Sequence, residues 1–593
     1  MSEDTPEPGR DYRQTVFLPE TPFPMRAGLP QKEPAILQAW AEADLYRSLR
    51  AERRGAGAPL FVLHDGPPYA NGAIHIGHAL NKILKDFVVR TRFALGYDVD
   101  YVPGWDCHGL PIEWKIEEQV RAQGRRKDET PTAEFRERCR AYAAEWIEKQ
   151  KVEFQRLGVL GEWERRYSTM DFAAEAAIVA EFHKVLMTGQ LYRGSKPVMW
   201  SPVERTALAD AEVEYHPHQS PTIWVKFPVV GEGDFGPRLR AVGADAPDAE
   251  PDPAGRGASV LIWTTTPWTI PGNRAIAYGP SIAYGLYEVE AVQTGLEFQP
   301  YAQVGERLIL ADKLAEDVRS AAKIARWRRT ADVDPSALTC EHPLAGVDPG
   351  YRYPVPLLPG AHVTEDAGTG FVHTAPSHGA EDYQVWLASG RRDVPDMVDE
   401  DGAYYPHVPL FGGLTVLETE GKKAGKFGPA NVAVAEALAG AGALLARGRL
   451  EHSYPHSWRS KAPVIYRNTP QWFIRLDEPL QSEDLGFIRL DEPLQSEDLG
   501  FIRLDEPGEE RPETLRGLAL AGIDATAWVP GGGRNRIRGM VENRPDWLIS
   551  RQRAWGTPLA MFVDRETGEP LRDEAVNSRI QAVIAAEGAD AWF

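Results

Sequence analysis

Cysteine is scarce in this sequence. Among 593 residues there are three, Cys107, Cys139 and Cys340, and no two of them form a CxxC pair. A disulfide framework and a cysteine-rich zinc site are therefore excluded. Cys107 is interpreted as a packing residue, because its neighbours give no sign of an activated thiolate.

A basic excess and long hydrophobic runs are also absent. The net charge is −20, from 66 basic and 86 acidic residues, which does not favour a nucleic-acid partner. Any RNA must bind through local basic patches. No apolar run reaches the length of a membrane span, and the acidic, polar N-terminus is unlike a signal peptide. We expect a cytoplasmic chain of several domains, with no membrane partner.

The most informative segment reads GPPYANGAIHIGHALNKILK, at residues 66–85. The apolar run at residues 61–63 predicts a buried strand, which ends at the Gly-Pro-Pro sequence. Asn71 and Gly72 predict a tight turn. The apolar residues that follow recur at helical spacing: Ile76, Leu80, Ile83, Leu84, Phe87 and Val88. The segment therefore predicts a strand, a loop and a helix.

His75 and His78 stand at the start of this predicted helix. Free backbone N–H groups and the helix dipole favour an anion there, and the two rings can reach one ligand. Gly77 between them leaves room for a flat group. The pair also has simpler interpretations, as a polar cap or as metal ligands, although no third ligand lies at a suitable spacing.

The sequence HIGH at residues 75–78 resembles the ATP-binding signature of class I aminoacyl-tRNA synthetases. The flanking PPYANG and NKILKD resemble the branched-aliphatic subgroup, and PGWDCHGLPIE at residues 103–113 resembles isoleucyl-tRNA synthetases. The resemblance implies an α/β fold: a Rossmann-like class I catalytic core with an inserted β-rich editing domain. It also implies ATP-dependent activation of L-isoleucine, with Mg²⁺, and its transfer to tRNA(Ile).

The resemblance also implies roles for individual residues. His75 and His78 would hydrogen-bond the ATP phosphates and stabilise charge as the adenylate forms. Asp106, after a predicted strand at residues 98–102, would pair with the substrate ammonium. Trp555 would wall the aliphatic pocket, or else simply pack in the core. The remaining residues implied to contact ATP or the adenylate are Gly66, Pro67, Asn71 and Gly77.

A second region resembles the family's editing domain. Its motifs are WTTTPWT at residues 263–269 with Asn273, and GTGFVHTAP at residues 368–376 with Asp382. A pocket for isoleucine excludes valine poorly, the standard example of this limit, so that a hydrolytic site is needed. Asp382 would pair with the ammonium of a misattached valine.

The other editing motif residues would orient the reactants. Hydroxyls of Thr264, Thr265 and Thr266 would position the attacking water and the terminal ribose. His373 would orient the substrate, and a role as general base stays open. Taken alone, the threonine run could equally be a β-strand with exposed hydroxyls.

The sequence also predicts how the chain divides into domains. An N-terminal extension, with a helical region at residues 33–49, precedes the first catalytic part. That part includes an amphipathic helix over residues 132–157, which Gly158 is expected to end. Strands are expected at residues 225–230, 259–263 and 307–311, and a loop at residues 231–257. The predicted boundaries are 1–55 for the extension, 56–200 for the first catalytic part, 201–440 for the editing domain and 441–593 for the return to the core.

Three departures from the family affect the reading. Where some relatives carry CxxC pairs, this chain has SPVE at residues 201–204 and SWRS at residues 457–460, so we expect no zinc. FIRLDEPLQSEDLG occurs at residues 473–486 and again at 487–500, and FIRLDEP follows at 501–507. Such identity suggests a tandem duplication or an assembly error, and we expect the extra 28 residues to form an exposed loop.

The third departure is that no KMSKS-type loop or anticodon-binding domain is found. We therefore expect an N-terminal portion of an isoleucyl-tRNA synthetase, monomeric, whose synthetic activity alone is doubtful. The alternatives are a chain acting only as an aminoacyl-tRNA deacylase and an inactive product of a broken gene.

Overall fold

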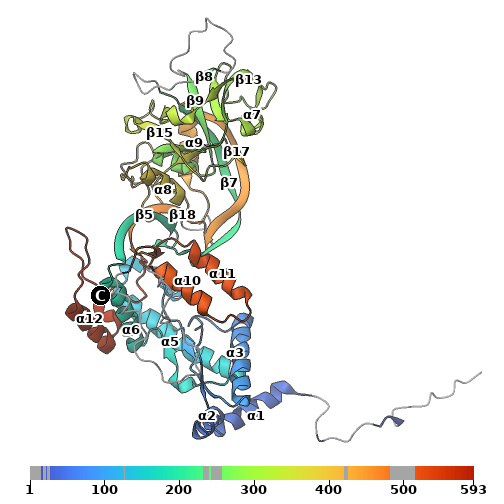
Figure 1. Cartoon of the computed structure of the whole chain (residues 1–593), viewed down its shortest axis with the longest axis vertical. Helices are drawn as coiled ribbons and strands as arrows, with labels where there is room; N and C mark the ends of the chain where they lie inside the picture. Colours follow the sequence, from blue (N-terminus) through green and yellow to red (C-terminus); the bar gives the residue numbers. More distant parts are fainter. Residues whose placement is uncertain are drawn as a thin grey trace, which may run out of the picture. The chain divides into compact units, whose positions relative to one another are not determined.

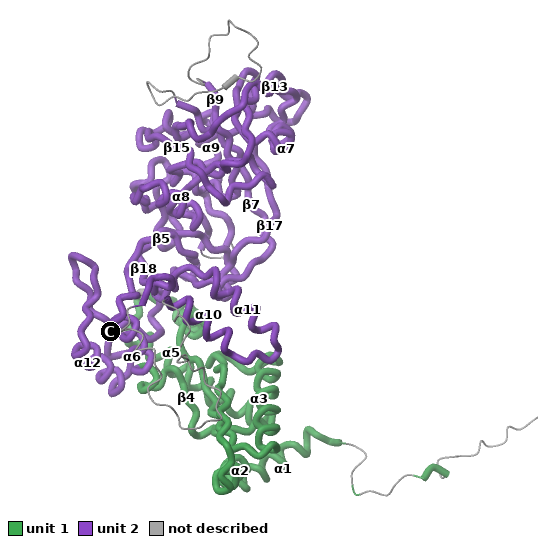
Figure 2. The backbone as a smooth tube through the Cα atoms, viewed as in Figure 1, with its two compact units in different colours: residues 1–175, 593 green, residues 176–592 purple. Residues whose placement is uncertain are grey.

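The computed structural model describes residues 15–17, 22, 27–125, 127–230, 240–241, 257–419, 425–480 and 514–593. The chain divides into two compact units (Figure 2). Unit 1 comprises residues 1–175 with Phe593, and unit 2 comprises residues 176–592. The four domains expected from the sequence remain a prediction, and each unit is described below by itself.

Unit 1 is built on a βαβ element. Strands β1 and β2 pair in parallel, with Leu60 beside Asp98 and Leu63 beside Tyr101, and helix α3 connects them. A second short parallel pair, β3 and β4, continues the chain. The elements are α1 (Leu29–Glu42), α2 (Leu45–Gly55), β1 (Leu60–Leu63), α3 (Ile76–Ala94), β2 (Asp98–Tyr101), β3 (Gly104–Trp105), α4 (Leu110–Ala122), α5 (Thr132–Arg156) and β4 (Tyr167–Ser168) (Figure 1).

Most local predictions for unit 1 are confirmed. The strand at residues 61–63 lies within β1, but it is not buried as expected, because Val62 is 59% exposed. The helix expected over residues 132–157 is α5. Gly158, at a φ of +80°, ends that helix as expected. The single helical region expected at residues 33–49 is instead two helices, because Asp44 adopts a left-handed φ of 42° between them.

Helix α3 carries its apolar stripe on the outside. Ile76 is 87% exposed, Leu80 61% and Phe87 59%, whereas Lys82 and Asp86 are buried. The helical spacing is therefore confirmed, but it does not mark the face that packs in unit 1. Lys82, which is not part of the stripe, is buried because its ammonium pairs with a buried carboxylate, that of Asp65.

Unit 2 is mainly β-structure. Its strands are β5 (Leu191–Ser201), β6 (Thr206–Ala207), β7 (Val213–Pro228), β8 (Arg240–Ala241), β9 (Ala258–Thr264), β10 (Ala275–Tyr278), β11 (Tyr284–Val292), β12 (Arg307–Ala311), β13 (Ile324–Val333), β14 (Thr339–Glu341), β15 (Pro354–Pro359), β16 (Phe371–Thr374), β17 (Leu444–Ser457), β18 (Ile465–Ile474) and β19 (Trp547–Leu548). Its helices are α6 (Phe172–Met187), which crosses the unit boundary, α7 (Ala315–Ala321), α8 (Ala380–Ala388), α9 (Pro429–Gly440), α10 (Leu515–Ala525), α11 (Gly532–Glu542) and α12 (Glu574–Glu587).

Three sheets organise the described strands of unit 2. The largest has the order β17-β7-β9-β12-β11-β13-β8, and the others are β14-β15-β10-β16 and β19-β18-β5-β6. The three strands expected near residues 225, 259 and 307 are confirmed as parts of β7, β9 and β12. The loop expected at residues 231–257 lies largely outside the described residues.

The chain leaves and re-enters one sheet through neighbouring strands. Strand β5 pairs antiparallel with β18, from Leu191 beside Ile474 to Trp200 beside Ile465. Strands β7 and β17 then run side by side as a long antiparallel pair (Figure 1). This is the geometry expected of an insertion with its two ends together. The sequence repeat begins in β18, and its residues 481–507 lie outside the described residues.

Candidate functional site

His75 and His78 form the cap of helix α3. The Nδ1 atom of His75 accepts a hydrogen bond from Gly77 N over 3.1 Å, and His78 Nδ1 accepts one from His75 N over 3.3 Å. The rings stack with centroids 3.9 Å apart. Burial, together with His75, lowers the pKa of His78. Because both Nδ1 atoms are acceptors, both rings are Nε2–H tautomers when neutral and offer outward donors at a helix N-terminus.

Gly77 favours this arrangement because it has no side chain. A Cβ atom at position 77 would lie 3.0 Å from Cε1 of His75, closer than side chains normally approach. The glycine therefore lets the first imidazole fold back onto the helix. Gly66 is exposed and Pro67 is half-buried in the loop before this cap.

The loop rests on a buried ion cluster that sequence reasoning missed. Asp65, immediately before Gly66, is fully buried and pairs with both Lys82 and Lys85 of α3. It also accepts a hydrogen bond from Gly104 N over 3.1 Å. One carboxylate thus joins the loop that precedes α3, α3 itself and the β3 segment. Both lysines lie off the apolar stripe of α3, and that spacing alone does not indicate their pairing with Asp65.

Helix α5 holds the same loop from the other side. Gln150, fully buried, donates to Tyr69 O over 3.0 Å and to Gly72 O over 2.7 Å. Its Oε1 accepts from Trp105 Nε1 over 3.0 Å. The Tyr142 hydroxyl donates to Asn71 Oδ1 over 2.8 Å. Asn71 therefore has a structural partner, and Gln150 was detectable only as a polar residue on the buried face of α5.

Asp106 lies beside the loop. Ala70 N donates to Asp106 O over 2.9 Å, and Asp106 N donates to Pro68 O over 2.9 Å. Burial raises the pKa of the Asp106 carboxyl, although His108 N and Tyr69 oppose the shift. The structure thus brings together His75, His78, Asn71 and Asp106 around residues 66–78. Binding of substrate by these residues stays a prediction.

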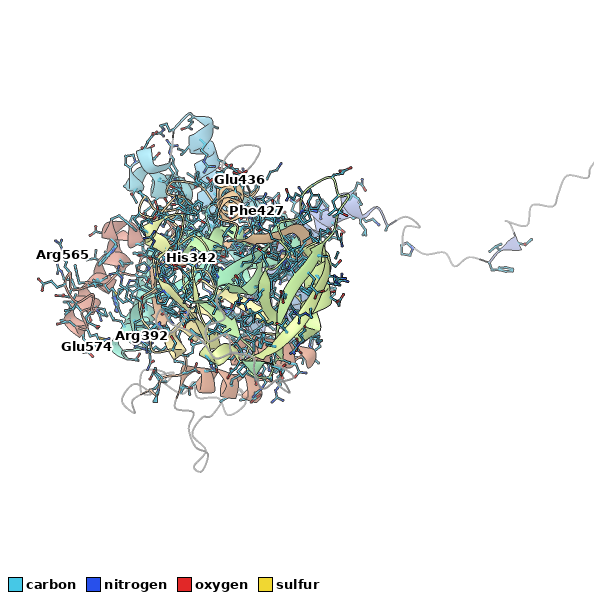
Figure 3. All side chains as sticks on the ribbon, turned by 90° about the horizontal axis from the view of Figure 1, so that it is seen from above. His342, Arg392, Phe427, Glu436, Arg565 and Glu574 are labelled. Atoms are coloured by element: carbon cyan, nitrogen blue, oxygen red, sulfur yellow. The ribbon has the colours of Figure 1, made fainter. Side chains whose placement is uncertain are left out.

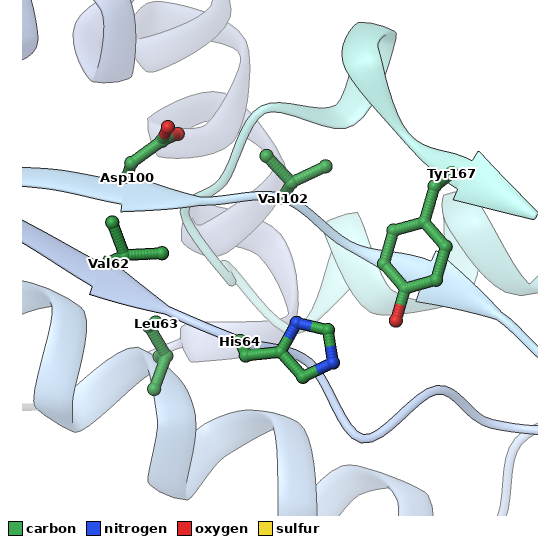
Figure 4. A pocket seen from close by; sticks show the side chains of 6 residues that line it. All are labelled: Val62, Leu63, His64, Asp100, Val102 and Tyr167. Carbon is green, nitrogen blue, oxygen red and sulfur yellow. The ribbon is translucent and has the colours of Figure 1, made fainter. Parts of the chain in front are cut away.

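Unit 1 also has a pocket of about 280 Å³ beside β1 and β2 (Figure 4). His64 and Tyr167 stack across it with centroids 6.2 Å apart. The other lining residues are Val62, Leu63, Asp100 and Val102. The pocket adjoins Asp65 in sequence, but none of the predicted site residues lines it.

In unit 2, the two editing-like motifs meet in a histidine–threonine cluster. It comprises Thr264, Thr266, Thr269, Asn273 and His373. The Nε2 atom of His373 lies 2.8 Å from Thr269 Oγ1, and its Nδ1 lies 2.9 Å from Asn273 Nδ2. The chain of hydroxyls continues from Thr269 to Thr266 over 3.3 Å and from Thr266 to Thr264 over 3.1 Å. Sequence reasoning left Thr269 out of the candidate residues, although the quoted motif contains it.

The electrostatics of this cluster favour orientation over proton transfer. Burial lowers the pKa of His373 to about 3. Its imidazole is therefore neutral at pH 7 and a weak base. An amide nitrogen can only donate, so His373 Nδ1 accepts and Nε2 carries the proton toward Thr269. The open role of general base is thus disfavoured.

Asp382 lies in the first turn of α8. Its Oδ2 accepts from Ala375 N over 2.8 Å, directly after β16, which carries His373. Burial raises the pKa of Asp382 to about 7. A carboxylate with this pKa gains stability from a nearby cation, because the cation favours its charged form. Thr265 is half-buried between Thr264 and Thr266.

Two further predicted features lie elsewhere in unit 2. Trp555 is fully buried, and its role in an amino-acid pocket stays a prediction. At the two sequences that replace CxxC pairs, Glu204 accepts from Ser457 Oγ over 2.7 Å and from Ser460 N over 3.0 Å. Among the described residues, no group of three or more His, Cys, Asp or Glu is arranged to hold a metal ion. No described helix is long and apolar enough to cross a membrane.

Comparison with known proteins decides the family. Residues 35–593 match the family model described as tRNA synthetases class I (I, L, M and V). The chain belongs to this family. The class I synthetase fold expected from the sequence is thereby confirmed.

Two curated relatives are isoleucine–tRNA ligases. That of Caulobacter vibrioides is 66% identical over 587 residues, covering 98% of this chain and 56% of the relative. That of Bradyrhizobium diazoefficiens is 51% identical over 603 residues, covering 98% of this chain and 55% of the relative. The chain thus spans a little over half the length of these relatives.

A solved structure is also similar in part. It is a ternary complex of LeuRS, tRNA and LeuAMS from Agrobacterium radiobacter, with a TM-score of 0.27 and 18% identity, covering 62% of this chain and 44% of that one.

Proposed function

We propose that this chain carries sites of a cytoplasmic isoleucine–tRNA ligase. The reaction is activation of L-isoleucine by ATP, with Mg²⁺, and transfer to tRNA(Ile), followed by hydrolysis of valine errors. Support comes from the identity of 66% to an isoleucine–tRNA ligase and from the two side-chain clusters that match the family's motifs.

For activation, the start of α3 is the proposed phosphate site. The Nε2–H groups of His75 and His78 would donate to phosphate oxygens, and Gly66, Pro67 and Gly77 let backbone approach the nucleotide. Asp106 would bind the amino acid's ammonium, whose charge favours ionisation of this buried carboxyl. The ion cluster at Asp65 and the bonds from Gln150 keep the loop in place for this task.

The single observation that best supports the hydrolytic activity is the arrangement of the histidine–threonine cluster beside Asp382. The Asp382 carboxylate would bind the ammonium of the misattached valine. The Thr264, Thr265 and Thr266 hydroxyls would position water and the terminal ribose, while His373 keeps Thr269 oriented. These steps need hydrogen bonds and one ion pair, all supplied by this chain.

The test is hydrolysis of valyl-tRNA(Ile) by the purified chain and by Asp382→Ala. We expect hydrolysis by the parent and at least a tenfold loss in the variant, since a charge-assisted hydrogen bond is removed. Asp366→Ala, at a carboxylate outside the motifs, is the control. Equal activity in parent and Asp382→Ala would refute the assignment. Isoleucine-dependent ATP–pyrophosphate exchange tests activation separately.

A further inference from the structure

Side chains outside the two motifs bind the main chain at Asn273, a member of the histidine–threonine cluster. The Tyr353 hydroxyl donates to the main-chain oxygen of Asn273 over 2.9 Å. Arg274 Nη1 donates to the same oxygen over 2.6 Å and to the Tyr353 hydroxyl over 2.7 Å. The guanidinium also lies 4.6 Å from the centroid of the Tyr353 ring. Two side chains therefore hold the Asn273 peptide.

His342 supports the turn that precedes Asn273; it is labelled in Figure 3. Its Nε2 donates to Ile270 O over 3.0 Å, and the same carbonyl accepts from Asn273 N over 3.0 Å. Its Nδ1 accepts from Leu344 N over 3.2 Å. The ring stacks on Tyr351 with centroids 4.5 Å apart at 13°. We call His342, Tyr351 and Tyr353 the aromatic clamp.

The position of Asn273 determines the tautomer of His373. Asn273 Nδ2 donates to Ala275 O over 2.8 Å, which can only accept, so the amide nitrogen must face this side. The same nitrogen lies 2.9 Å from His373 Nδ1 and makes it an acceptor. The His373 proton is then on Nε2, toward Thr269. If the Asn273 amide were displaced, His373 would no longer prefer the Nε2–H tautomer.

The side-chain amide of Asn273 has a second possible orientation, in which its oxygen and nitrogen exchange places. Asn273 is fully buried, and its Oδ1 has no hydrogen-bond partner within the part of the chain that the structure describes. If the amide turned over, this oxygen would accept a hydrogen bond from His373 Nδ1–H and select the other tautomer. Thr269 would then face a bare nitrogen, and its bond to Thr266 O would be lost.

We propose that Tyr353 and Arg274, supported by His342, are positioning residues that hold Asn273 and thereby keep His373 in the Nε2–H tautomer. The consequence for catalysis rests on the hydrolytic function proposed above. Tyr353, Arg274 and His342 bond to the main chain of Asn273 and Ile270 and not to His373, so they act on His373 through Asn273.

The test compares Tyr353→Phe with Tyr351→Phe in the full chain. Both remove one hydroxyl from the aromatic clamp, but that of Tyr351 donates to Pro409 O, over 2.9 Å, away from Asn273. The first readout is the pair of ring ¹⁵N chemical shifts of His373, assigned by their loss in His373→Gln. The second is kcat and KM for hydrolysis of valyl-tRNA(Ile).

We expect Tyr353→Phe to move the His373 nitrogens toward a mixture of tautomers and to lower kcat about tenfold, the effect of one ordinary hydrogen bond, with KM unchanged. Tyr351→Phe should change neither readout. If Tyr353→Phe and Tyr351→Phe both leave the two readouts unchanged, or both lower kcat equally, the proposal is overturned, because a packing role would affect the two variants equally. If the parent chain hydrolyses nothing, the proposed function fails, and the ¹⁵N shifts alone decide the positioning role.

Discussion

Replacement of Gln150 by leucine should loosen the loop that carries the ATP signature. Gln150 is fully buried and makes three hydrogen bonds, as donor to Tyr69 O and Gly72 O and as acceptor from Trp105 Nε1. Leucine is of similar volume, so the main change is the loss of these bonds. Tyr69 O, Gly72 O and Trp105 Nε1 would then each lose one hydrogen bond.

The expected loss of stability depends on how deeply each group that loses its hydrogen bond is buried. Tyr69 O also accepts from Asn71 N over 2.9 Å, so its loss costs little. Trp105 is fully buried and cannot reach water, and Gly72 O loses its donor at 2.7 Å. An unsatisfied buried group costs about 1–3 kcal/mol. Gly72 is only half-buried, so water can replace part of its lost donor. We therefore expect Gln150→Leu to destabilise unit 1 by about 2–3 kcal/mol, mostly from Trp105.

The assay is hydrogen exchange of peptides covering residues 66–85 and 98–110, combined with urea unfolding, because exchange assigns the loss to unit 1. The matched control is Gln155→Leu. Gln155 is half-buried on the same helix, and its side chain has no hydrogen-bond partner among the residues described. If the two variants lose equal stability, or if exchange at residues 66–85 is unchanged in Gln150→Leu, the reasoning about the loop is refuted.

Three further outcomes can be measured. Since burial raises the pKa of Asp382 to about 7, the KM for valyl-tRNA(Ile) should fall as pH rises from 6 to 8 and the carboxylate forms; the same slope in Asp382→Asn would contradict this. Lys82→Met should cost about 3–5 kcal/mol in urea unfolding, because it strips one partner from the buried Asp65, and adding Asp65→Leu should restore part of the loss; a double variant weaker than both singles would contradict it. Burial lowers the pKa of His342 and of His373 to about 3, below the unfolded value of 6.5, so both rings take up protons on unfolding. Unit 2 should therefore lose stability as pH falls from about 6.5 toward 3. His342→Gln should make this loss shallower, and an unchanged slope would contradict the prediction.

Local patterns in the sequence predicted local structure well. The apolar spacing over residues 132–157 and the glycine after it gave α5 and its end, because helix period and C-cap preference act over a few residues. The motif at residues 75–78 gave a helix cap for the same reason. The family motifs also placed His373 and Asn273 in one cluster, although a hundred residues separate them.

Contacts between distant segments were beyond such patterns. The spacing of apolar residues does not indicate that Lys82 is buried, because a charge is buried only where a partner from another segment, here Asp65, satisfies it. Gln150 looked like one polar residue in a long helix. Tyr353 and His342 belong to no motif, and only the packing of β14 and β15 against the cluster brings them to Asn273 and Ile270. Periodicity carries no information about such partners.

The same hydrogen-bonding pattern recurs at four histidines in or next to the two candidate sites. At His75, His78, His342 and His373 the Nδ1 atom accepts a hydrogen bond from a backbone or side-chain N–H, which leaves the proton of the neutral ring on Nε2. Burial lowers the pKa of the last three, which opposes the charged form. A ring fixed in this way is a directional donor and a poor proton carrier. We therefore propose that these rings orient reactants at both candidate sites, in chemistry where positioning and electrostatic stabilisation supply most of the rate.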